Sequence, residues 1–299
     1  MQFAPARAAA AVALPLAAVL VGCAGPSGGT GRPLSEVFPD PALASCVATA
    51  AGLPAVGVVS AADLASVDEL RCVGGLSVDG PVRSLEGIGE LPSLATVDLS
   101  RNEITDLGPL ASLPRLSTLT LTANAIADLS PLEGLQLFDL GLSQNPVSDL
   151  GPLAGTTTLT ALGVAAAEVT DISALAGHDA LRELDLSGNA ITDVAPLAGL
   201  PALDTLRLSR NRITDAAPLG TIPTLLVLDV FGNGITDVGG LAAAPLLQEL
   251  QLGANPVTDL TPLLGVWSLV NLGLDETDPA GLTGVAELRA AGVSVNGLA

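Results

Sequence analysis

Residues 181–197 read LRELDLSGNAITDVAPL, and residues 203–219 read LDTLRLSRNRITDAAPL. The two stretches start 22 residues apart and share leucines, an asparagine, an isoleucine and an aspartate at matching positions. Self-similarity at a short fixed period indicates stacked units, each of which buries its apolar side chains only against its neighbours. We therefore predict one continuous repeat array instead of several globular domains.

The asparagine is a ruler for the rest of the array. Steps of 22 residues, with one step of 21, lead through Asn102, Asn124, Asn145, Ala167, Asn189, Asn211, Asn233, Asn255 and Thr277. The form L-x-x-L-x-L-x-x-N-x-I at this period resembles the leucine-rich repeat. The resemblance implies an α/β solenoid over residues 73–277, a leucine-rich-repeat horseshoe with a parallel sheet on its concave face.

Each residue type in the repeat has a physical task. Alternation along the strand turns Leu184 and Leu186 inward and Asp185 outward. The asparagine amide can pair with backbone groups of its own and the neighbouring coil, and the later Asp193 can cap the next turn. Ala167 has no side-chain amide, so we expect its coil to be the least stable of the array.

The composition argues against two kinds of partner. The formal net charge is −20, and all 11 basic residues are arginines. Binding to nucleic acid depends largely on cations that neutralise phosphates, and adhesion to anionic lipid needs a polybasic segment. We expect neither. The acidity either keeps an aliphatic surface soluble or steers a cationic partner, and the sequence leaves both possibilities open.

Residues 1–22 resemble a secretory leader. Arg7 precedes the apolar run 8–21, which is shorter than the roughly 17–25 residues of a membrane span. The run ends in Leu-Val-Gly-Cys23, similar to a bacterial lipobox, which implies that Cys23 is the lipidated first residue of the exported protein. Lipid on Cys23 would anchor the protein to a membrane, with residues 23–33 as a flexible tether. The alternative is an ordinary leader with an incidental cysteine.

Residues 34–72 are expected to form an N-terminal helical cap, because a stacked array exposes an apolar end that must be covered. Asp40 and the proline after it can open one helix, which Gly52 ends. Ser60 begins a capping-box sequence, so a second short helix is expected to run to about Leu70.

Two cysteines lie in this cap region. With Cys23 committed to lipid, Cys46 and Cys72 make an even pair in a protein exported to an oxidising compartment. We predict a Cys46–Cys72 disulfide that fastens the cap to the first strand. Two buried thiols are the alternative.

Residues 278–299 are expected to form a second cap. Asp278 and the following proline should start a helix that Gly292 ends. Residues 293–295 should then close the stack as its last strand.

With these features the chain resembles internalin-type bacterial leucine-rich-repeat proteins. The form N-x-I-x-D-[LIV]-x-P-L recurs, as in residues 102–110, and residues 38–44 and 85–88 resemble the family's cap and first coil. The resemblance covers roughly 38–295. It implies an extracellular surface for a protein or glycan ligand, and it does not identify the receptor. The immunoglobulin-like region and wall anchor common in internalins have no counterpart in this sequence, so we expect a plain surface lipoprotein.

Outward strand positions are where a ligand would contact the sheet. Most of them are small and polar. The exceptions lie on four neighbouring strands: Glu183, Asp185, Arg207, Arg210, Asp229, Phe231, Glu249 and Gln251. An exposed phenylalanine beside arginine is typical of interface anchors. However, Asp185, Arg207 and Asp229 on adjacent rungs could neutralise one another and need no partner. Phe138 and Trp267 lie off these columns and are expected to be packing residues.

The sequence gives little support for catalysis or metal binding. His178, the single histidine, is expected in a solvated loop with no nucleophile fixed beside it. One aspartate recurs in each coil: Asp106, Asp128, Asp149, Asp171, Asp193, Asp215, Asp237 and Asp259. One carboxylate per coil falls short of the roughly six to eight oxygens that calcium takes. We predict turn capping by these aspartates, no metal, no cofactor and no enzymatic activity.

The sequence therefore predicts a lipid-anchored, non-catalytic protein of the cell surface or envelope that binds a protein or glycan through its concave face. An architectural or self-associating envelope protein without a dedicated ligand is the alternative, and a hydrolase is a distant third. Ligand identity, oligomeric state and membrane leaflet are not specified by the sequence.

Overall fold

The computed structural model describes residues 31–54, 56–75 and 79–298. The predicted leader, Cys23 and most of the tether lie outside these residues. Among the residues described, no helix has both the length and the apolar character needed to cross a membrane.

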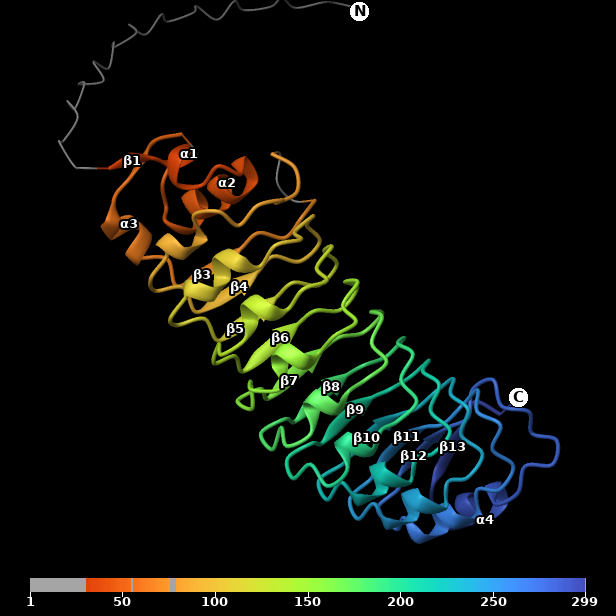
Figure 1. The fold of residues 1–299 in the computed structure, drawn as a ribbon. Coiled ribbons are helices and arrows are strands. Elements are labelled where there is room, and N and C mark those ends of the chain that lie inside the picture. The colour runs from red at the N-terminus through yellow and green to blue at the C-terminus, as the bar shows by residue number, and fades with distance from the viewer. Residues whose placement is uncertain (1–30, 55, 76–78, 299) are drawn as a thin grey trace, which may run out of the picture. The chain divides into compact units, whose positions relative to one another are not determined.

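One sheet of eleven parallel strands runs through the repeat array in chain order (Figure 1). The strands are β3 (Glu69–Arg71), β4 (Thr96–Asp98), β5 (Thr118–Thr120), β6 (Asp139–Gly141), β7 (Ala161–Gly163), β8 (Glu183–Asp185), β9 (Thr205–Arg207), β10 (Val227–Asp229), β11 (Glu249–Gln251), β12 (Asn271–Gly273) and β13 (Ser294–Asn296). In each strand the middle side chain is buried and its two neighbours face the other way. Leu184 pairs with Leu206 and Asp185 with Arg207, which confirms the solenoid and its predicted register.

A short 3₁₀ helix lies on the far side of each complete coil. These helices are η1 (Ile88–Glu90), η2 (Gly108–Ser112), η3 (Ser130–Leu132), η4 (Gly151–Leu153), η5 (Ser173–Leu175), η6 (Ala195–Leu197), η7 (Ala217–Thr221), η8 (Gly239–Ala243) and η9 (Thr261–Gly265). Before η2 to η9 the recurring aspartate accepts the N–H two residues on, as Asp193 Oδ1 does from Ala195 at 2.8 Å. The donation by the Ser130 N–H lowers the pKa of Asp128. These aspartates cap turns, as predicted.

The asparagines form a hydrogen-bonded ladder between coils. Asn211 donates to the Leu186 and Leu208 carbonyls and accepts from the Ile191 N–H, each at 3.0 Å. The same contacts recur at Asn102, Asn124, Asn145, Asn189, Asn233 and Asn255. Each amide therefore satisfies buried backbone groups of two coils.

The N-terminal cap contains five short elements: β1 (Arg32–Pro33), α1 (Leu34–Val37), α2 (Pro41–Ala50), β2 (Val58–Val59) and α3 (Ala61–Ala65). Asp40 caps α2 by accepting from the N–H groups of Ala42 and Leu43. Its second oxygen accepts from the N–H groups of Arg83 (2.7 Å) and Ser84 (3.0 Å), so one carboxylate joins the cap to the first coil. Burial would raise the pKa of Asp40, but these four backbone donors together hold it below its usual value.

The Cys46–Cys72 disulfide is present and joins α2 to the residue after β3. The prediction of a helix from Ser60 to about Leu70 was wrong in length. The Ser60–Asp63 capping box forms, but α3 ends at Ala65 because Leu70 enters β3 and pairs in parallel with Val97.

The predicted C-terminal helix also begins later than expected. Asp278 caps only a turn, accepting from the Ala280 N–H at 2.8 Å, and α4 spans Val285–Ala290. Gly281 and Gly284 have φ values of 83° and 89°, which a right-handed helix cannot contain. The closing strand forms as β13.

His178 was expected in a solvated loop, and this prediction was wrong. Its side chain is fully buried, with Nε2 3.2 Å from the Leu153 carbonyl and no hydrogen-bond partner for Nδ1. The physical reason is the repeat frame: His178 stands 22 residues before Leu200, at a position that is buried in its coil.

Candidate functional site

The strand face of the sheet brings together the eight residues that the sequence singled out. Glu183 and Asp185 lie on β8, Arg207 on β9, Asp229 on β10, and Glu249 and Gln251 on β11, in hydrogen-bonded register. Arg210 and Phe231 lie just beyond the ends of β9 and β10. We call these eight residues the strand-face patch.

Arg207 lies between two carboxylates but forms no salt bridge with them within the described residues. Asp185 and Asp229 flank it on the adjacent strands, but each carboxylate accepts an N–H of its own chain segment at 3.0 Å, from Ser187 and Phe231. The salt bridges found within the described residues join other pairs: Arg32–Glu90, Arg71–Glu69 and Arg83–Glu103. Arg207 is therefore an exposed cation that no carboxylate of the described chain holds.

Other members of the strand-face patch spread over glycines. A Cβ added at Gly273 would collide with Gln251 Oε1, so the Gln251 side chain extends across the bare backbone of β12. Arg210 has φ 56°, a left-handed conformation, and its Cγ would lie 3.4 Å from a Cβ at Gly232. Phe231 is half-buried on the same edge. These side chains are positioned by packing along the sheet.

A hollow that the sequence analysis did not single out lies beside the patch. It has a volume of about 270 Å³, and its floor includes Gly141 on β6 and Gly163 on β7. Thr120 and Asp139 form one wall, while Glu183, Asp185 and Arg207 form the other. The signal in the sequence was two successive glycines in one outward column. Two adjacent strands without side chains leave a depression between strands that have them.

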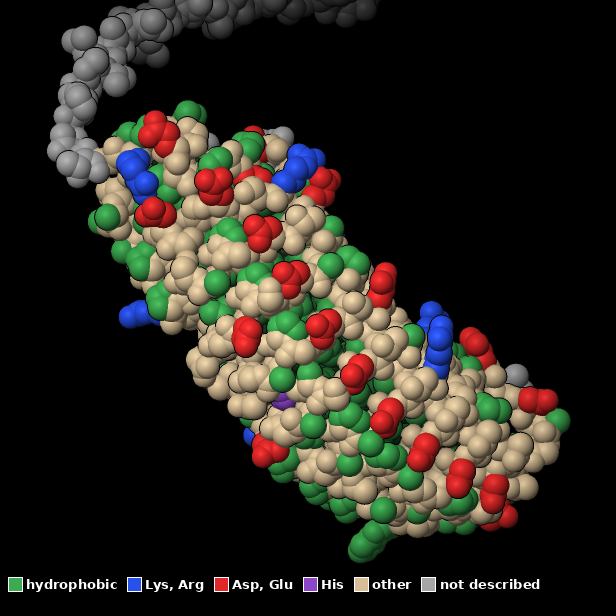
Figure 2. Space-filling view, in the orientation of Figure 1, with side chains coloured by type: hydrophobic (Ala, Val, Ile, Leu, Met, Phe, Trp, Pro, Cys, Tyr) green, Lys and Arg blue, Asp and Glu red, His purple; other side chains and the backbone are tan. Residues whose placement is uncertain are grey.

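Carboxylates outnumber cations over the array, and Figure 2 shows them repeating along successive coils. Among the residues described, no group of three or more His, Cys, Asp or Glu side chains is placed to hold a metal ion. The turn-capping aspartates recur once per coil, so the repeat separates them along the array.

The prediction that Phe138 and Trp267 are packing residues was wrong. Trp267 is 94% exposed and Phe138 is 51% exposed. Trp267 occupies the turn position at which the two preceding coils have Pro223 and Pro245, which are also exposed. Phe138 directly precedes β6, at a position that turns away from the core.

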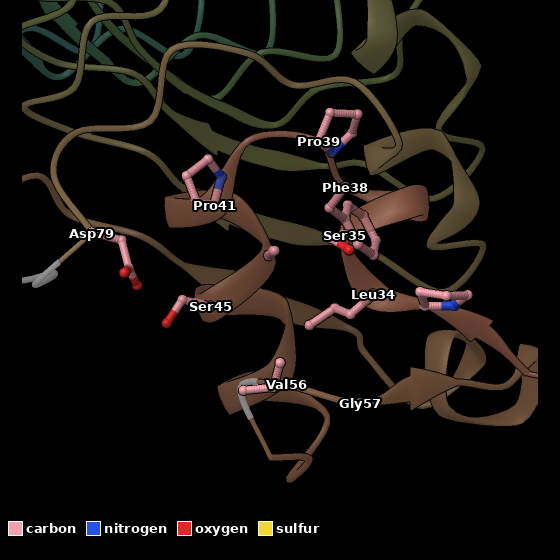
Figure 3. Close-up of a pocket in the computed structure, with 11 residues that line it drawn as sticks. Leu34, Ser35, Phe38, Pro39, Pro41, Ser45, Val56, Gly57 and Asp79 are labelled. Carbon is pink, nitrogen blue, oxygen red and sulfur yellow. The ribbon is translucent and has the colours of Figure 1, made fainter.

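A second depression lies in the N-terminal cap (Figure 3), with a volume of about 360 Å³. Its walls are mainly apolar and include Leu34, Phe38, Pro41 and Val56, with Ser35, Ser45 and Asp79 at polar points. Phe38 is fully buried, so the walls belong to the packing of the cap. The depression lies on the cap and away from the strand-face patch.

Family models match three parts of the array. The model described as leucine-rich repeats in two copies matches residues 92–134 and 179–221, and a single leucine-rich-repeat model matches residues 221–242. No curated protein matches the sequence of the chain.

Solved structures of similar fold include two internalins of Listeria monocytogenes. The chain is 29% identical to an internalin (inlF), with a TM-score of 0.83, covering 90% of this chain and 78% of that one. It is 32% identical to internalin C2, with a TM-score of 0.61, covering 82% of this chain and 99% of that one. A leucine-rich-repeat protein of Leptospira interrogans shares the fold at 22% identity and a TM-score of 0.68, covering 78% of this chain and 62% of that one.

Proposed function

Because this chain belongs to the internalin family of leucine-rich-repeat proteins, we propose that it binds a protein or glycan ligand on the concave strand face and performs no catalysis. Leucine-rich-repeat proteins of this kind generally mediate protein binding. A curved sheet suits that role because it presents many outward side chains on a rigid frame.

The observation that carries the proposal is that Arg207 is exposed and forms no salt bridge within the described residues. An exposed arginine that no carboxylate of the described chain engages keeps its five N–H donors available. Phe231 supplies apolar area at the neighbouring strand end, and arginine with an aromatic residue is a common anchor at protein interfaces. Asp185 and Asp229 each accept an N–H of their own chain segment and form no salt bridge with Arg207 within the described residues, which favours an available cation over the self-neutralised ladder.

The hollow over Gly141 and Gly163 also favours the strand face as the binding surface. Arg207 is part of its lining, and its volume of about 270 Å³ could hold a side chain of a ligand that lies across the strands. A protruding group in the hollow and an acidic group on Arg207 would fix the ligand at two points, which increases specificity more than a single contact does.

Capture of partners tests the strand face. We expect immobilised protein to retain a specific partner from envelope or host extracts, and the double variant R207E/F231A to lose it. Arg212→Glu makes the same charge change in the same coil off the strand face, and it should retain the partner. Equal capture by all three folded proteins would show that the ligand does not bind at the strand face. Concentration-dependent self-assembly without capture would favour an architectural role.

We also propose that the protein is exported and held on a membrane through lipid on Cys23, which lies outside the described residues. The support is the lipobox-like sequence that ends in Cys23. Cys23→Ser should move the protein from the membrane fraction to the soluble fraction. Retention of Cys23→Ser in the membrane fraction would contradict the anchor.

A further inference from the structure

Two kinds of carboxylate lie on the strand face. Asp98, Asp185 and Asp229 are the third residues of their strands, and each accepts the N–H two residues further on at 3.0 Å. Asp139 and Glu183 are the first residues of β6 and β8, and both are exposed. Within the described residues neither forms a hydrogen bond or an ion pair through its side chain. These two carboxylates, which also line the hollow, are therefore available to a ligand.

Asp139 and Glu183 stand on either side of one small residue. The strand register places Asp139 opposite Ala161, and Ala161 opposite Glu183. Adjacent strands lie about 4.8 Å apart, so the backbones that carry the two carboxylates are roughly 10 Å apart. The methyl group of Ala161 between them leaves room for one side chain of a ligand, whose end both carboxylates can approach.

The floor of the hollow is apolar and open to solvent. Gly141, Ala161 and Gly163 line the hollow and are each partly exposed, so the floor belongs to the accessible surface. A Cβ added at Gly163 would meet only Ser143 Oγ, at 3.4 Å, so no other atom outside the adjacent residues fills the space directly above it. A group from outside the protein therefore reaches the floor and both carboxylates without displacing a buried residue.

The charges of the lining favour a cation. Asp139, Glu183 and Asp185 supply three carboxylates, and Arg207 supplies one positive charge. An apolar side chain would remove water from Asp139 and Glu183 without replacing it, which is unfavourable for charged groups, and an acidic side chain would be repelled. A lysine side chain suits both parts of the hollow. Its aliphatic stem covers the apolar floor, and its ammonium group has three N–H donors for carboxylates on two sides.

Given the proposed function, on which this inference rests, we propose that the hollow receives a lysine side chain of a protein ligand, with its ammonium group between Asp139 and Glu183. Arg207, on β9, lies two strands from Ala161, on β7, so it can pair with an acidic residue of the same ligand segment. The opposite charges of the ligand segment and the strand face then fix the position in which the two dock.

Nuclear magnetic resonance of the ¹⁵N-labelled protein tests the site in solution. Nα-acetyl-lysine amide is the probe, and Nα-acetyl-norleucine amide, which has the stem without the ammonium group, is the control. We expect saturable shifts of the Gly141 and Gly163 N–H signals with the lysine probe, and at least roughly fivefold weaker binding of the control because both ion pairs are lost. The absence of a saturable response to the lysine probe, or equal binding of the two compounds, would overturn the proposal.

Glucosamine separates a protein ligand from a glycan. It carries an ammonium group on a polar sugar ring without an aliphatic stem, so it should bind more weakly than the lysine probe at about pH 6, where both amines are charged. Binding of glucosamine as tight as that of the lysine probe would overturn the choice of a protein ligand.

Variants locate the response. D139N/E183Q removes both charges and should abolish the lysine response, whereas E133Q/E168Q makes the same change of net charge off the strand face and should retain it. Gly163→Val places a side chain on the open floor and should also abolish the response, without changing a charge. A lysine response of undiminished affinity in folded D139N/E183Q would contradict the proposal. Because the comparison of lysine and norleucine uses the unaltered protein, the test holds if a variant fails to fold.

Partner capture keeps this inference separate from the proposed function. We expect D139N/E183Q to weaken capture of the partner. If D139N/E183Q captures the partner as well as the unaltered protein does, while R207E/F231A loses it, the ligand binds the strand face but places no lysine in the hollow. If neither variant loses the partner, the strand face itself is not the binding surface.

Discussion

Two regions of the array follow the same repeat: the coils around Asn211 and Asn233, and the coils between Asn124 and Asn189. They differ in how many of their buried polar groups have hydrogen-bond partners. In the first region each asparagine amide bonds to two coils, and the buried column beside the 3₁₀ helices holds Leu200 and Ile222. In the middle region Ala167 interrupts the ladder. The same buried column there holds Thr156 and His178, each with one polar atom that lacks a partner.

This difference separates shape from stability. The strand register is identical in the two regions, because the buried leucines of β6 to β11 fix the spacing of the coils. The number of buried polar groups without a hydrogen-bond partner varies from coil to coil, but the strand register does not change. The middle coils also hold the hollow over Gly141 and Gly163 and a surface notch of about 390 Å³ at Ala167, so unpartnered polar groups and surface depressions occur together there.

The largest expected loss of stability comes from removing an asparagine of the ladder in the regular region, as Ala167 does in the middle region. Asn211→Ala removes two donors and one acceptor from a buried site, so the free energy of unfolding should fall by roughly 3–5 kcal/mol. Urea denaturation measures it. Asn271→Ala removes the same amide from the strand face and should change stability by less than about 0.5 kcal/mol. An equal loss in both variants would show that the ladder has no special role.

The cap end extends the comparison, because Asp40 performs there the linking task of an asparagine. Asp40→Ala should lower the free energy of unfolding by about 2–4 kcal/mol, since it removes a helix cap and two further charged hydrogen bonds. The folded state lowers the pKa of Asp40 below 3.8. Its contribution should therefore be complete above the unfolded-state pKa and disappear as the pH falls through the folded-state pKa.

Acid titration of stability checks this prediction. The unaltered protein should lose stability more steeply below about pH 4 than Asp40→Asn, which has no carboxyl to protonate at this position. Asp68→Ala, at an exposed position of the same cap region, should preserve the steep dependence. Identical acid profiles for the unaltered protein and Asp40→Asn would refute the assignment.

Completing the interrupted rung should have the opposite sign. Ala167→Asn gives the Val147 N–H an acceptor and two carbonyls a further donor, so the free energy of unfolding should rise by about 1–2 kcal/mol. Ala165→Asn is the control and should have an effect within about 0.5 kcal/mol. A loss of stability in Ala167→Asn would mean that the rung cannot close around an asparagine.

The smallest effect is expected at His178. His178→Leu restores the residue type of Leu200 and removes a buried nitrogen without a partner, while the Leu153 carbonyl retains the Thr156 N–H at 2.8 Å. A gain of about 1 kcal/mol follows, measurable as a higher midpoint in urea. A clear loss would indicate that the Nε2 contact with Leu153 outweighs the unsatisfied Nδ1.

Features that recur with the 22-residue repeat were predicted correctly from the sequence. Predictions failed where single residues, such as a glycine or a histidine, determine the local structure. Strands, the asparagine ladder and the aspartate caps follow from the 22-residue register, so each was found. The helix expected from Asp278 starts late because Gly281 and Gly284 take left-handed conformations, which composition alone does not reveal. His178 was misplaced because its polarity was weighed above its position in the frame.

The candidate site was predicted only in part. The six residues of the strand-face patch that lie on strands share one face because strand alternation sets their columns, whereas Arg210 and Phe231 lie beyond the strand ends. Their hydrogen bonds could not be predicted, since an aspartate beside an arginine can bond to either the guanidinium or its own backbone. The hollow and the notch depend on side chains that are missing, at Gly141, Gly163 and Ala167, and they become visible only when neighbouring coils are stacked.

Native-state hydrogen exchange at two equivalent amides tests the central comparison most directly. Val147 and Ile191 occupy the same repeat position, in the interrupted and the complete region respectively. After correction for intrinsic rates, we predict that the Val147 N–H exchanges at least roughly tenfold faster than the Ile191 N–H, and that Ala167→Asn removes the difference. Equal protection of the two amides in the unaltered protein would contradict the account.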